Sequence, residues 1–576
     1  MQVVFETFRP DGTGWSACFD QPNRVYVARR RSEVIQHLKT VELACQAGKW
    51  AVLVLTYEAS RAFDPAFRVH DALGLPLMWA GIYDGTVECP APSHASYSVP
   101  RWEPAISHEQ YANAIHTIHK YIEAGLTYQV NYTFPLKSEF RGDAWAWYRD
   151  LAPAQGAGFS AYVDLGPWAL LSLSPELFFE RKGVTVTVRP MKGTMPRGRW
   201  REEDEQMVSR LRTDPKNRAE NVMIVDLLRN DLGRIARAGT VRPVSLFEVE
   251  TYESILQMTS TIEATCVPGV GLVEIFTALF PCGSVTGAPK ISTMGIIRDL
   301  ETGPRGVYTG AIGFIKPGGD CTFNVAIRTI HLDRDTGVAT FGVGGGVTYD
   351  STAPAEYDEC LLKAEFLSKP PNDFDLFETI LFEDGQYYLL EAHLARMRES
   401  AAYFRFRFPE RDIRAELEAA RTGRRPGAAR VRVLLRRRGA FTVATSELVR
   451  DPHRIRGVAL AEQPASSREP SIFHKTTNRR FYEEALQGRP DVDDIIFWNE
   501  QGEITESSIA NVVIPDGERN WTPPVDCGLL AGTLRAELIA LGEIQERRIL
   551  KSQLREGQRI YLINSVQSWM AAEIVK

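Results

Sequence analysis

The sequence lacks the features that would place it in several classes of protein. It has no apolar run long enough to span a bilayer, and the residues from Met1 to Glu6 contain no basic segment followed by an apolar run. We therefore expect neither a membrane segment nor a signal peptide. The formal net charge is −6, so the chain also lacks the basic excess of a general nucleic-acid-binding protein.

The cysteines form no recognisable pattern. Eight of them are scattered over 576 residues, and no two form a Cys-x-x-Cys pair. We therefore expect neither a disulfide framework nor a zinc site, and the pattern is typical of a reducing, cytoplasmic location. An apolar content of 44% and a charged content of 24% indicate a globular protein, and its length predicts more than one domain.

One proline-rich stretch predicts a domain boundary. The stretch from Lys369 to Asp373 ends a helical pattern, and a new strand pattern begins at Asp375. The sequence therefore predicts a first domain over residues 1–369 and a second over residues 373–576.

In the first domain, Lys192 follows a strand predicted at Val184–Val188. A proline interrupts the strand pattern, so Lys192 is expected at a turn that ends in Gly193-Thr194. Partial burial at such a rigid position would lower the pKa of the amine and leave some of it as a neutral nucleophile. A solvated loop lysine is the simpler interpretation of this residue taken alone.

Two further residues lie in predicted strands. Glu176 falls within the apolar run Leu170–Phe179, where burial would raise its pKa and allow it to donate a proton. An edge position paired with solvent is the alternative. Arg328 ends the alternating run from Phe323, on the same face as Asn324, and an inward arginine there would require a carboxylate.

Two helices carry acidic residues of interest. The first is predicted to begin at Asp214, and Glu220 lies off its apolar stripe, where a solvated helix face is the simpler interpretation. In the second, Glu359 shares a face with Glu356 and Lys363. A hard cation such as Mg²⁺ would offset the like charges there, although a surface salt bridge is the simpler interpretation of these residues taken alone.

A Gly/Ser/Thr-rich loop, Pro281–Lys290, precedes another predicted helix. It does not match a nucleotide-binding P-loop. Backbone N–H groups around Gly287 could meet a carboxylate near the helix N-terminus, or the loop could be a plain tight turn.

The second domain opens with a hairpin pattern at Leu376–Leu390. The basic strand at Arg430–Arg438 is expected to keep most of its arginines in solvent. Lys475 lies at a polar strand end, Glu506 in a turn of small residues, and Thr533 follows a glycine where a helix could open onto a phosphate.

Residues from about 100 to 368 resemble the chorismate-utilising enzymes. The resemblance is carried by Ser174-Pro175-Glu176, Arg189 to Thr194, Arg218 to Asn221 with Arg229-Asn230-Asp231, Gly283 to Lys290, and Gly344 to Lys363. Within that family the chain is most similar to the aminodeoxychorismate synthases, because the anthranilate synthases carry alanine where this chain has Lys192.

The resemblance implies a mechanism and a set of site residues. Lys192 would attack C2 of chorismate, Glu176 would protonate the departing C4 hydroxyl, and ammonia would add at C4. The implied Mg²⁺ ligands are Glu220 and Glu359. The implied substrate-binding residues are Arg328, Gly287, Tyr308 and Lys363. Gln257 stands where many relatives have histidine, so a role assigned to that histidine does not transfer.

Residues from about 373 to 576 resemble the fold-type IV pyridoxal-phosphate enzymes, and among them the aminodeoxychorismate lyases. Lys475 matches the lysine that binds pyridoxal phosphate covalently, and Glu506 the acid that pairs with the pyridine nitrogen. Arg396 and Thr533 match the residues that bind the cofactor phosphate.

Together the two resemblances imply an α+β protein. A two-sheet, sandwich-like chorismate-binding domain would precede a two-subdomain domain of the D-amino-acid-aminotransferase type. The implied function is bifunctional: amination of chorismate to 4-amino-4-deoxychorismate, then elimination of pyruvate to give 4-aminobenzoate for folate synthesis. No cysteine lies in a Gly-x-Cys-x-Gly elbow, so a separate glutamine amidotransferase subunit is expected to supply ammonia. Relatives also suggest a homodimer through the second domain.

Two other functions remain open. One is an anthranilate or isochorismate synthase joined to a D-amino-acid or branched-chain aminotransferase. The other is a catalytically silent chorismate- or tryptophan-binding sensor attached to one active domain, for which Gln257 is the only support.

Overall fold

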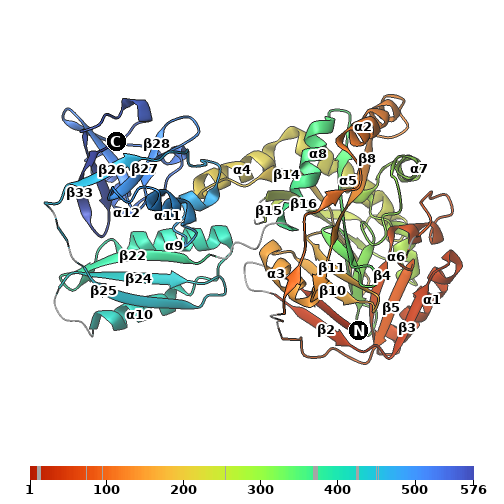
Figure 1. Cartoon of the computed structure of the whole chain (residues 1–576). Helices are drawn as coiled ribbons and strands as arrows, with labels where there is room; N and C mark the ends of the chain where they lie inside the picture. The colour runs from red at the N-terminus through yellow and green to blue at the C-terminus, as the bar shows by residue number, and fades with distance from the viewer. Residues whose placement is uncertain are drawn as a thin grey trace. The chain divides into compact units, whose positions relative to one another are not determined.

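The computed structural model of this chain describes residues 1–8, 14–72, 74–91, 93, 95–252, 255–367, 374–422, 427–448, 450–451 and 453–576. It divides into two compact units (Figure 1). The first consists of Met1–Pro196 and Met207–Asn372, and the second of Arg197–Gln206 and Asp373–Lys576. The proline-rich boundary expected at residues 369–373 lies outside the described residues.

The first unit is built on two large sheets. The nine-stranded sheet has the order β17 (Gly287–Ala288), β8 (Gln129–Glu139), β21 (Val338–Val347), β20 (Thr329–Asp333), β11 (Trp168–Ser174), β10 (Phe159–Asp164), β1 (Gln2–Glu6) and β2 (Ser16–Asp20), with β7 (Glu103–Pro104) also on β8. The ten-stranded sheet has the order β14 (Met191–Pro196), β16 (Ile255–Thr265), β13 (Thr185–Arg189), β12 (Leu177–Lys182), β19 (Cys321–Val325), β18 (Ala311–Ile315), β4 (Trp50–Leu55), β5 (Met78–Tyr83) and β3 (Arg24–Ala28), with β15 (Arg242–Thr251) also on β16.

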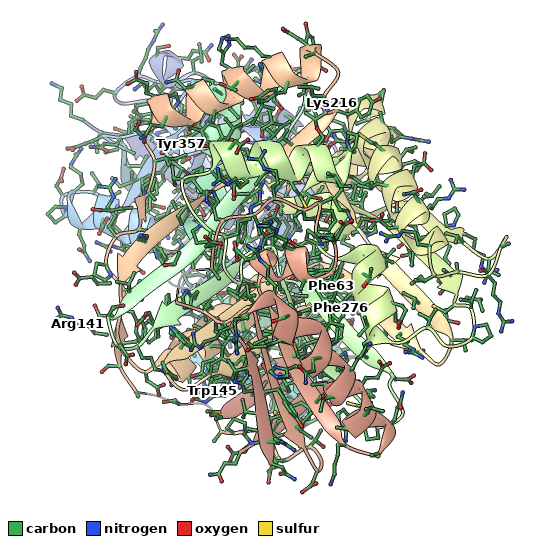
Figure 2. All side chains as sticks on the ribbon, turned by 90° about the vertical axis from the view of Figure 1, so that its right-hand side faces the viewer. Phe63, Arg141, Trp145, Lys216, Phe276 and Tyr357 are labelled. Atoms are coloured by element: carbon green, nitrogen blue, oxygen red, sulfur yellow. A yellow bond between two sulfur atoms is a disulfide. The ribbon has the colours of Figure 1, made fainter. Side chains whose placement is uncertain are left out.

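The sheets pack face to face, and helices cover both outer faces. A core that includes Phe19, Val52 and Leu170 fills the layer between the sheets. The ten-stranded sheet is covered by α1 (Arg31–Gln46), α5 (Pro215–Gly233) and α6 (Leu272–Leu279), and the nine-stranded sheet by α2 (His108–Glu123), α3 (Ala144–Gln155), α7 (Lys290–Leu300) and α8 (Ala353–Leu362). Phe63 and Phe276, neighbours in Figure 2, stack in the first of these outer cores with ring centroids 5.9 Å apart. The sandwich expected from the sequence is confirmed.

The chain crosses between the two sheets at Pro175-Glu176. The apolar run Leu170–Phe179 is therefore two strands: β11 belongs to the nine-stranded sheet and β12 to the ten-stranded sheet. It crosses back after β19, and the Ser174 hydroxyl donates a 2.6 Å hydrogen bond to the Val325 carbonyl, which joins the two crossings. The strand expected over Phe323–Arg328 was wrong at its end, because β19 stops at Val325 so that the chain can change sheets.

Local rules predicted the helix ends well. In the sequence, Ser107 precedes Gln110 by three residues, a pattern that predicts a capping box, and the two residues form that box at the start of α2. Asp214, expected to begin a helix, caps α5 by accepting from the Asn217 amide at 2.8 Å. The sequence predicts an apolar stripe along α5 made of Val222, Val225, Leu228 and Leu232. This prediction was wrong at one position, because Val222 is 41% exposed. No described helix has the length and apolar character needed to cross a membrane.

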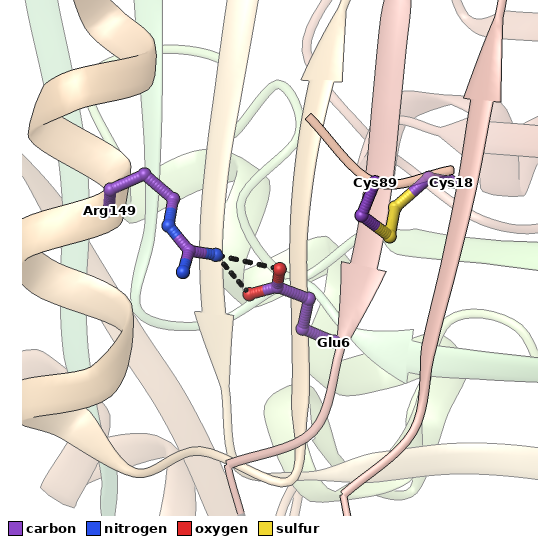
Figure 3. The surroundings of a disulfide bond; sticks show 4 residues. All are labelled: Glu6, Cys18, Cys89 and Arg149. Carbon is purple, nitrogen blue, oxygen red and sulfur yellow. Dashed lines mark hydrogen bonds and ion pairs between the residues drawn. A yellow bond between two sulfur atoms is a disulfide. The ribbon is translucent and has the colours of Figure 1, made fainter. Parts of the chain in front are cut away.

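One disulfide departs from the cysteine expectation. Cys18 on β2 is bonded to Cys89, with Cα atoms 5.2 Å apart, whereas the other six cysteines are free (Figure 3). In the same region Arg149 donates to both Glu6 oxygens at 2.7 and 2.9 Å. The scattered spacing did not reveal this pair, because the two cysteines are 71 positions apart in the sequence and meet only in the folded chain.

The second unit contains two sheets. A four-stranded sheet has the order β23 (Gln386–Tyr387), β22 (Leu376–Glu383), β24 (Ala429–Leu435) and β25 (Phe441–Glu447), and it packs on α9 (Leu390–Phe404) and α10 (Glu410–Thr422). An eight-stranded sheet has the order β28 (Ile504–Ser507), β27 (Asp494–Trp498), β26 (Arg456–Leu460), β33 (Ser568–Ile574), β32 (Arg559–Asn564), β29 (Asn511–Asp516), β30 (Arg519–Thr522) and β31 (Gln545–Glu546). Two further helices are α11 (Arg480–Gln487) and α12 (Thr533–Ala540).

The segment Arg197–Gln206 belongs to this second unit, although it follows β14 in the sequence. The Arg197 guanidinium lies 3.9 Å from the centre of the Tyr403 ring, and the Trp200 ring lies 4.8 Å from that of Phe473. The second unit is therefore assembled from two separate stretches of chain.

Candidate functional site

Lys192 lies inside β14 and not at a turn, which corrects the expectation from the sequence. β14 pairs with β16, and the register shifts between Met191 and Thr194. Gly193 adopts φ +107° within this irregularity, a conformation that glycine adopts at little cost. A bulge of this kind turns a side chain out of the regular alternation, and it directs Lys192 toward α5.

The Lys192 amine forms an ion pair with Glu220 of α5, with 3.3 Å between nitrogen and oxygen. The two side chains are only 16% and 21% exposed. The neighbouring Asn221 amide donates to the Lys192 carbonyl at 3.2 Å, so α5 holds both the side chain and the backbone of this residue. Glu220 was interpreted as part of a solvated helix face, and this interpretation was wrong because β14 packs against that face.

The glycines of β21 line the other side of the lysine. A Cβ atom on Gly346 would lie 2.5 Å from the Lys192 amine and 2.6 Å from the Gln129 amide nitrogen. A Cβ atom on Gly345 would lie 2.8 Å from a Glu356 oxygen. Only glycine lets these side chains approach the strand so closely, which explains the run Gly344-Gly345-Gly346.

Glu176 is 3% exposed, and burial raises the pKa of its carboxyl to about 7. The Ser284 hydroxyl donates a 2.7 Å hydrogen bond to this carboxyl and so limits the rise in its pKa. The environment expected for a proton donor is therefore present at the crossing between the sheets. Tyr308 is near enough to this carboxylate to respond to its charge, and its own pKa is raised, mainly by burial. The Tyr308 ring packs on Gly342 of β21.

Glu359 and Lys363 form the expected ion pair along α8, at 2.8 Å. Burial alone would raise the pKa of Glu359. Three nearby lysines outweigh burial and lower this pKa: Lys363, Lys192 and Lys216. Lys192 therefore lies within electrostatic reach of Glu359 as well as Glu220. Across the described ranges, no three His, Cys, Asp or Glu side chains gather as a metal site.

Two glutamines beside Lys192 differ in how their amides are bonded. Gln129 of β8 is fully buried, and neither polar atom of its side chain has a partner within the described part of the chain. Gln257 of β16 donates to the Gly193 carbonyl and accepts from Thr194, each at 3.1 Å, so it supports the bulge. Sequence reasoning missed Gln129, although a polar residue opening a buried strand was a usable signal.

The other predicted residues of this site lie at its margins. Gly287 has φ +147° and pairs with Val130, where a Cβ atom would meet the Gln129 carbonyl at 2.1 Å. Arg328 follows the second crossing with φ +47°, and its guanidinium donates to Gln155 at 3.0 Å. It has no carboxylate partner among the described residues.

A second candidate site surrounds Lys475. A short 3₁₀ turn, η4 (Pro470–Phe473), precedes it, so the strand expected there was wrong. The Phe377 amide of β22 donates to the Lys475 carbonyl at 3.0 Å. Burial, then the nearby Arg396, lowers the pKa of the Lys475 amine to about 8.

Glu506 lies in β28 and not in a turn, and it is 7% exposed. The Tyr482 hydroxyl of α11 donates to one of its oxygens at 2.8 Å and the Leu530 amide to the other at 3.1 Å. Burial nevertheless raises the pKa of Glu506 to about 7. Lys475 is close enough to lower this pKa slightly, so the two predicted groups share one site.

Arg396 and Thr533 meet at the start of α12. Arg396 donates to both oxygens of buried Glu378, at 2.8 and 2.7 Å, and to the Ala531 carbonyl at 3.0 Å. His393 connects Glu378, at 2.7 Å, to the Thr533 hydroxyl, at 3.3 Å. An arginine, a hydroxyl and a helix N-terminus therefore face one point, a combination that suits a phosphate. Glu378 and His393 were not predicted from the sequence.

The comparisons with known proteins cover both units. Residues 11–369 match the family described as chorismate binding enzyme, and residues 375–574 match the family described as amino-transferase class IV. Aminodeoxychorismate synthase component 1 of Klebsiella aerogenes is 39% identical over 270 residues, which are 47% of this chain and 59% of that protein. Aminodeoxychorismate synthase of Streptomyces griseus is 44% identical over 256 residues, 44% of this chain and 35% of that protein. The chain thus spans about half the length of these curated relatives.

Among solved structures, anthranilate synthase component I from Streptococcus pneumoniae matches with a TM-score of 0.51. The match covers 64% of this chain and 90% of that one, at 24% identity. At this identity the likeness shows the fold alone.

Substitution of Gln129 by methionine should raise the stability of the first unit. Removing a buried amide that has no partner eliminates a desolvation penalty of about 1–3 kcal/mol. Gln257→Met is the matched control, and it should lower stability because it breaks two hydrogen bonds. The melting temperature of the first unit, measured by calorimetry, checks both. A fall in both variants would contradict the assignment of the Gln129 side chain as a buried amide without a partner among the described residues.

Proposed function

We propose, since this chain belongs to the chorismate-binding enzymes, that it makes 4-aminobenzoate from chorismate in two steps, one in each unit. The first unit replaces the C4 hydroxyl of chorismate with an amine from ammonia and releases water. The second removes pyruvate from the resulting 4-amino-4-deoxychorismate. The observation that carries the proposal is Lys192, a largely buried amine held 3.3 Å from Glu220 beside the glycines of β21.

Lys192 acts as the nucleophile of the first step. It attacks ring C2, and the double bonds shift so that the C4 hydroxyl departs. Ammonia then adds at C4, and the lysine leaves C2 as the ring bonds return. The bulge in β14 and the hydrogen bonds from Gln257 hold the amine in place for both events. The fixed position lowers the entropic cost of reaching the transition state.

Glu176 supplies the proton that the departing hydroxyl requires. Its pKa of about 7 keeps much of the carboxyl protonated at neutral pH, and the Ser284 hydroxyl fixes its orientation. Arg328, Lys363, Tyr308 and the backbone near Gly287 bind the substrate around it. Arg328 has no carboxylate partner among the described residues, so its guanidinium is available to a substrate carboxylate.

The donor groups of this site fit Mg²⁺. Glu220 and Glu359 both lie within electrostatic reach of Lys192. Mg²⁺ commonly takes only one or two protein carboxylates and completes its shell with water and substrate oxygens. Each of these carboxylates also pairs with a lysine, Glu220 with Lys192 and Glu359 with Lys363. These two residues would hold the ion, and the ion would offset the negative charge of a bound substrate carboxylate.

The second unit fits pyridoxal phosphate. Lys475 would hold the cofactor covalently. Glu506 would pair with the pyridine nitrogen of the cofactor, and Arg396 and Thr533 would bind its phosphate. When bound, the cofactor stabilises the negative charge that develops at a substrate carbon on loss of a proton. Lys475 then removes the hydrogen from C4 of the substrate, pyruvate leaves from C3, and the ring becomes aromatic. The gain in aromaticity favours elimination over amine transfer.

We also propose that a separate glutamine amidotransferase supplies the ammonia, as the component 1 naming of the Klebsiella relative suggests. A homodimer through the second unit and a cytoplasmic location remain part of the proposal.

Lys192→Ala should abolish formation of aminodeoxychorismate from chorismate, ammonium and Mg²⁺, because it removes the amine that forms the ion pair with Glu220. Product analysis by chromatography measures this, and Lys182→Ala, which removes a lysine that is 72% exposed on β12, should not change it. Unchanged turnover would reject the nucleophile, and 2-aminobenzoate from the unsubstituted enzyme would indicate an anthranilate synthase instead.

The rate of the first step should fall as the pH rises through about 7. Burial raises the pKa of Glu176, so the protonated donor is present below that pH and lost above it. Initial rates at a fixed concentration of free ammonia measure the effect. Glu176→Gln should slow the step by about 10²–10⁴-fold and remove this dependence. A flat profile in the unsubstituted enzyme would reject Glu176 as the donor.

Lys475→Ala should prevent covalent attachment of pyridoxal phosphate while leaving the first step intact. Borohydride reduction followed by mass spectrometry detects the attached cofactor. Lys551, whose amine lies over the Trp498 ring in the same unit, provides the control variant Lys551→Ala. Attachment that survives in Lys475→Ala would place the anchor elsewhere.

A further inference from the structure

His474 directly precedes Lys475, and its backbone is extended, with φ −125° and ψ 147°. Successive side chains of an extended chain point to opposite sides. The Lys475 amine lies 5.0 Å from the centre of the Phe377 ring of β22. The imidazole of His474 packs instead on the end of α9, with its centre 4.5 Å from that of the Tyr403 ring and 4.7 Å from that of Phe404. The two neighbours therefore contact different parts of the second unit.

Both ring nitrogens of His474 have hydrogen-bond partners. Nε2 lies 3.3 Å from the Arg199 carbonyl, and Nδ1 lies 3.0 Å from the Ser400 hydroxyl of α9. A carbonyl oxygen only accepts, so Nε2 carries the hydrogen, and Nδ1 accepts from the hydroxyl. Burial lowers the pKa of His474 to about 4, so the imidazole is neutral at pH 7 and keeps this one tautomer. The ring is therefore fixed both in place and in direction.

The Arg199 carbonyl belongs to the segment Arg197–Gln206, which has further contacts within the second unit. The Arg197 guanidinium donates to the Tyr403 carbonyl at 2.9 Å. The Arg199 guanidinium donates to the Ser467 carbonyl at 2.8 Å. The carbonyl that accepts from the imidazole is thus anchored by hydrogen bonds on either side of it.

Packing alone does not explain a histidine at this position. An apolar ring would fill the same space beside α9 without burying two polar nitrogens, which costs free energy unless both are paired. The imidazole adds direction, because its two hydrogen bonds come from two separate stretches of chain. One residue later, the Phe377 amide donates to the Lys475 carbonyl at 3.0 Å. The backbone that carries the reactive amine is therefore held by β22, by α9 and by the segment Arg197–Gln206.

We propose that His474 is a positioning residue for Lys475. Its imidazole fixes the backbone immediately before the lysine, so that the amine meets the aldehyde of pyridoxal phosphate, and later the substrate, from one direction. The segment Arg197–Gln206 then forms part of the second site, although it lies outside the residues matched to the amino-transferase family. This inference rests on the cofactor-dependent function proposed above.

Two substitutions separate the direction of the ring from its packing. His474→Phe keeps a ring beside α9 but loses both hydrogen bonds, whereas His474→Gln keeps an N–H group for the Arg199 carbonyl. Labelling the full chain with acetic anhydride at a series of pH values, followed by mass spectrometry, gives the pKa of Lys475 without the cofactor. His474→Phe should raise this pKa from about 8 by about one unit, because a displaced amine regains water. His474→Gln should restore most of the original value.

The same variants should differ in how tightly they hold the cofactor. His474→Phe should weaken binding of pyridoxal phosphate about 10-fold, measured by equilibrium dialysis of the full chain, and His474→Gln should recover most of the affinity. His331→Phe is the matched control. Burial also lowers the pKa of His331 to about 4, but this residue lies on β20 of the first unit, so its substitution should change neither measurement.

Ser400→Ala provides a second, milder variant if His474→Phe fails to fold. It removes only the donor to Nδ1, and it should raise the pKa of Lys475 in the same direction. An unchanged pKa in Ser400→Ala and in every folded variant of His474 would overturn the inference, as would equal shifts in His474→Phe and His474→Gln. If the unsubstituted chain attaches no pyridoxal phosphate, the proposed function of the second unit has failed. If it attaches the cofactor and the pKa of Lys475 does not depend on His474, only the role of His474 has failed.

Discussion

The ion pair between Lys192 and Glu220 is the interaction on which the first site depends. It joins β14 to α5 across the outer face of the ten-stranded sheet, and the two side chains are largely withdrawn from water. A cation in such a place requires a negative partner, because removing a charge from water costs more than one isolated contact returns. The bulge in β14, the Gln257 hydrogen bonds and the glycines of β21 all serve to put the amine within reach of that partner.

The two sites hold their lysines in contrasting ways. Lys192 has a carboxylate at ion-pair distance, whereas Lys475 has none among the described residues and lies near the cation Arg396. Burial and this neighbour lower the pKa of Lys475 to about 8, which favours the neutral amine that covalent attachment to an aldehyde requires. Glu378 allows the arrangement, since it neutralises Arg396 within the core.

Each site also contains one buried acid whose protonation and orientation are set by its surroundings. Glu176 and Glu506 both have a pKa raised by burial to about 7, yet each accepts fixed hydrogen bonds that limit the shift. Each carboxyl is thereby oriented and remains able to hold or release a proton near neutral pH. The fold of the sheets fixes the position of both residues. Glu176 lies where the chain crosses between two sheets, and Glu506 lies on β28, where the Leu530 amide donates to it.

The sequence alone determined the local elements and the reactive residue types. Capping residues at Ser107 and Asp214, and the β-turn at Asp384-Gly385, depend on neighbours in the chain, so local chemistry was sufficient to predict them. Only the tertiary structure decided which groups meet. The ion pair of Lys192 with Glu220, the Cys18–Cys89 bond and the approach of the Lys475 amine to the Phe377 ring all join residues distant in sequence. Their distances follow from how sheets and helices pack, and no periodicity along the chain encodes that packing.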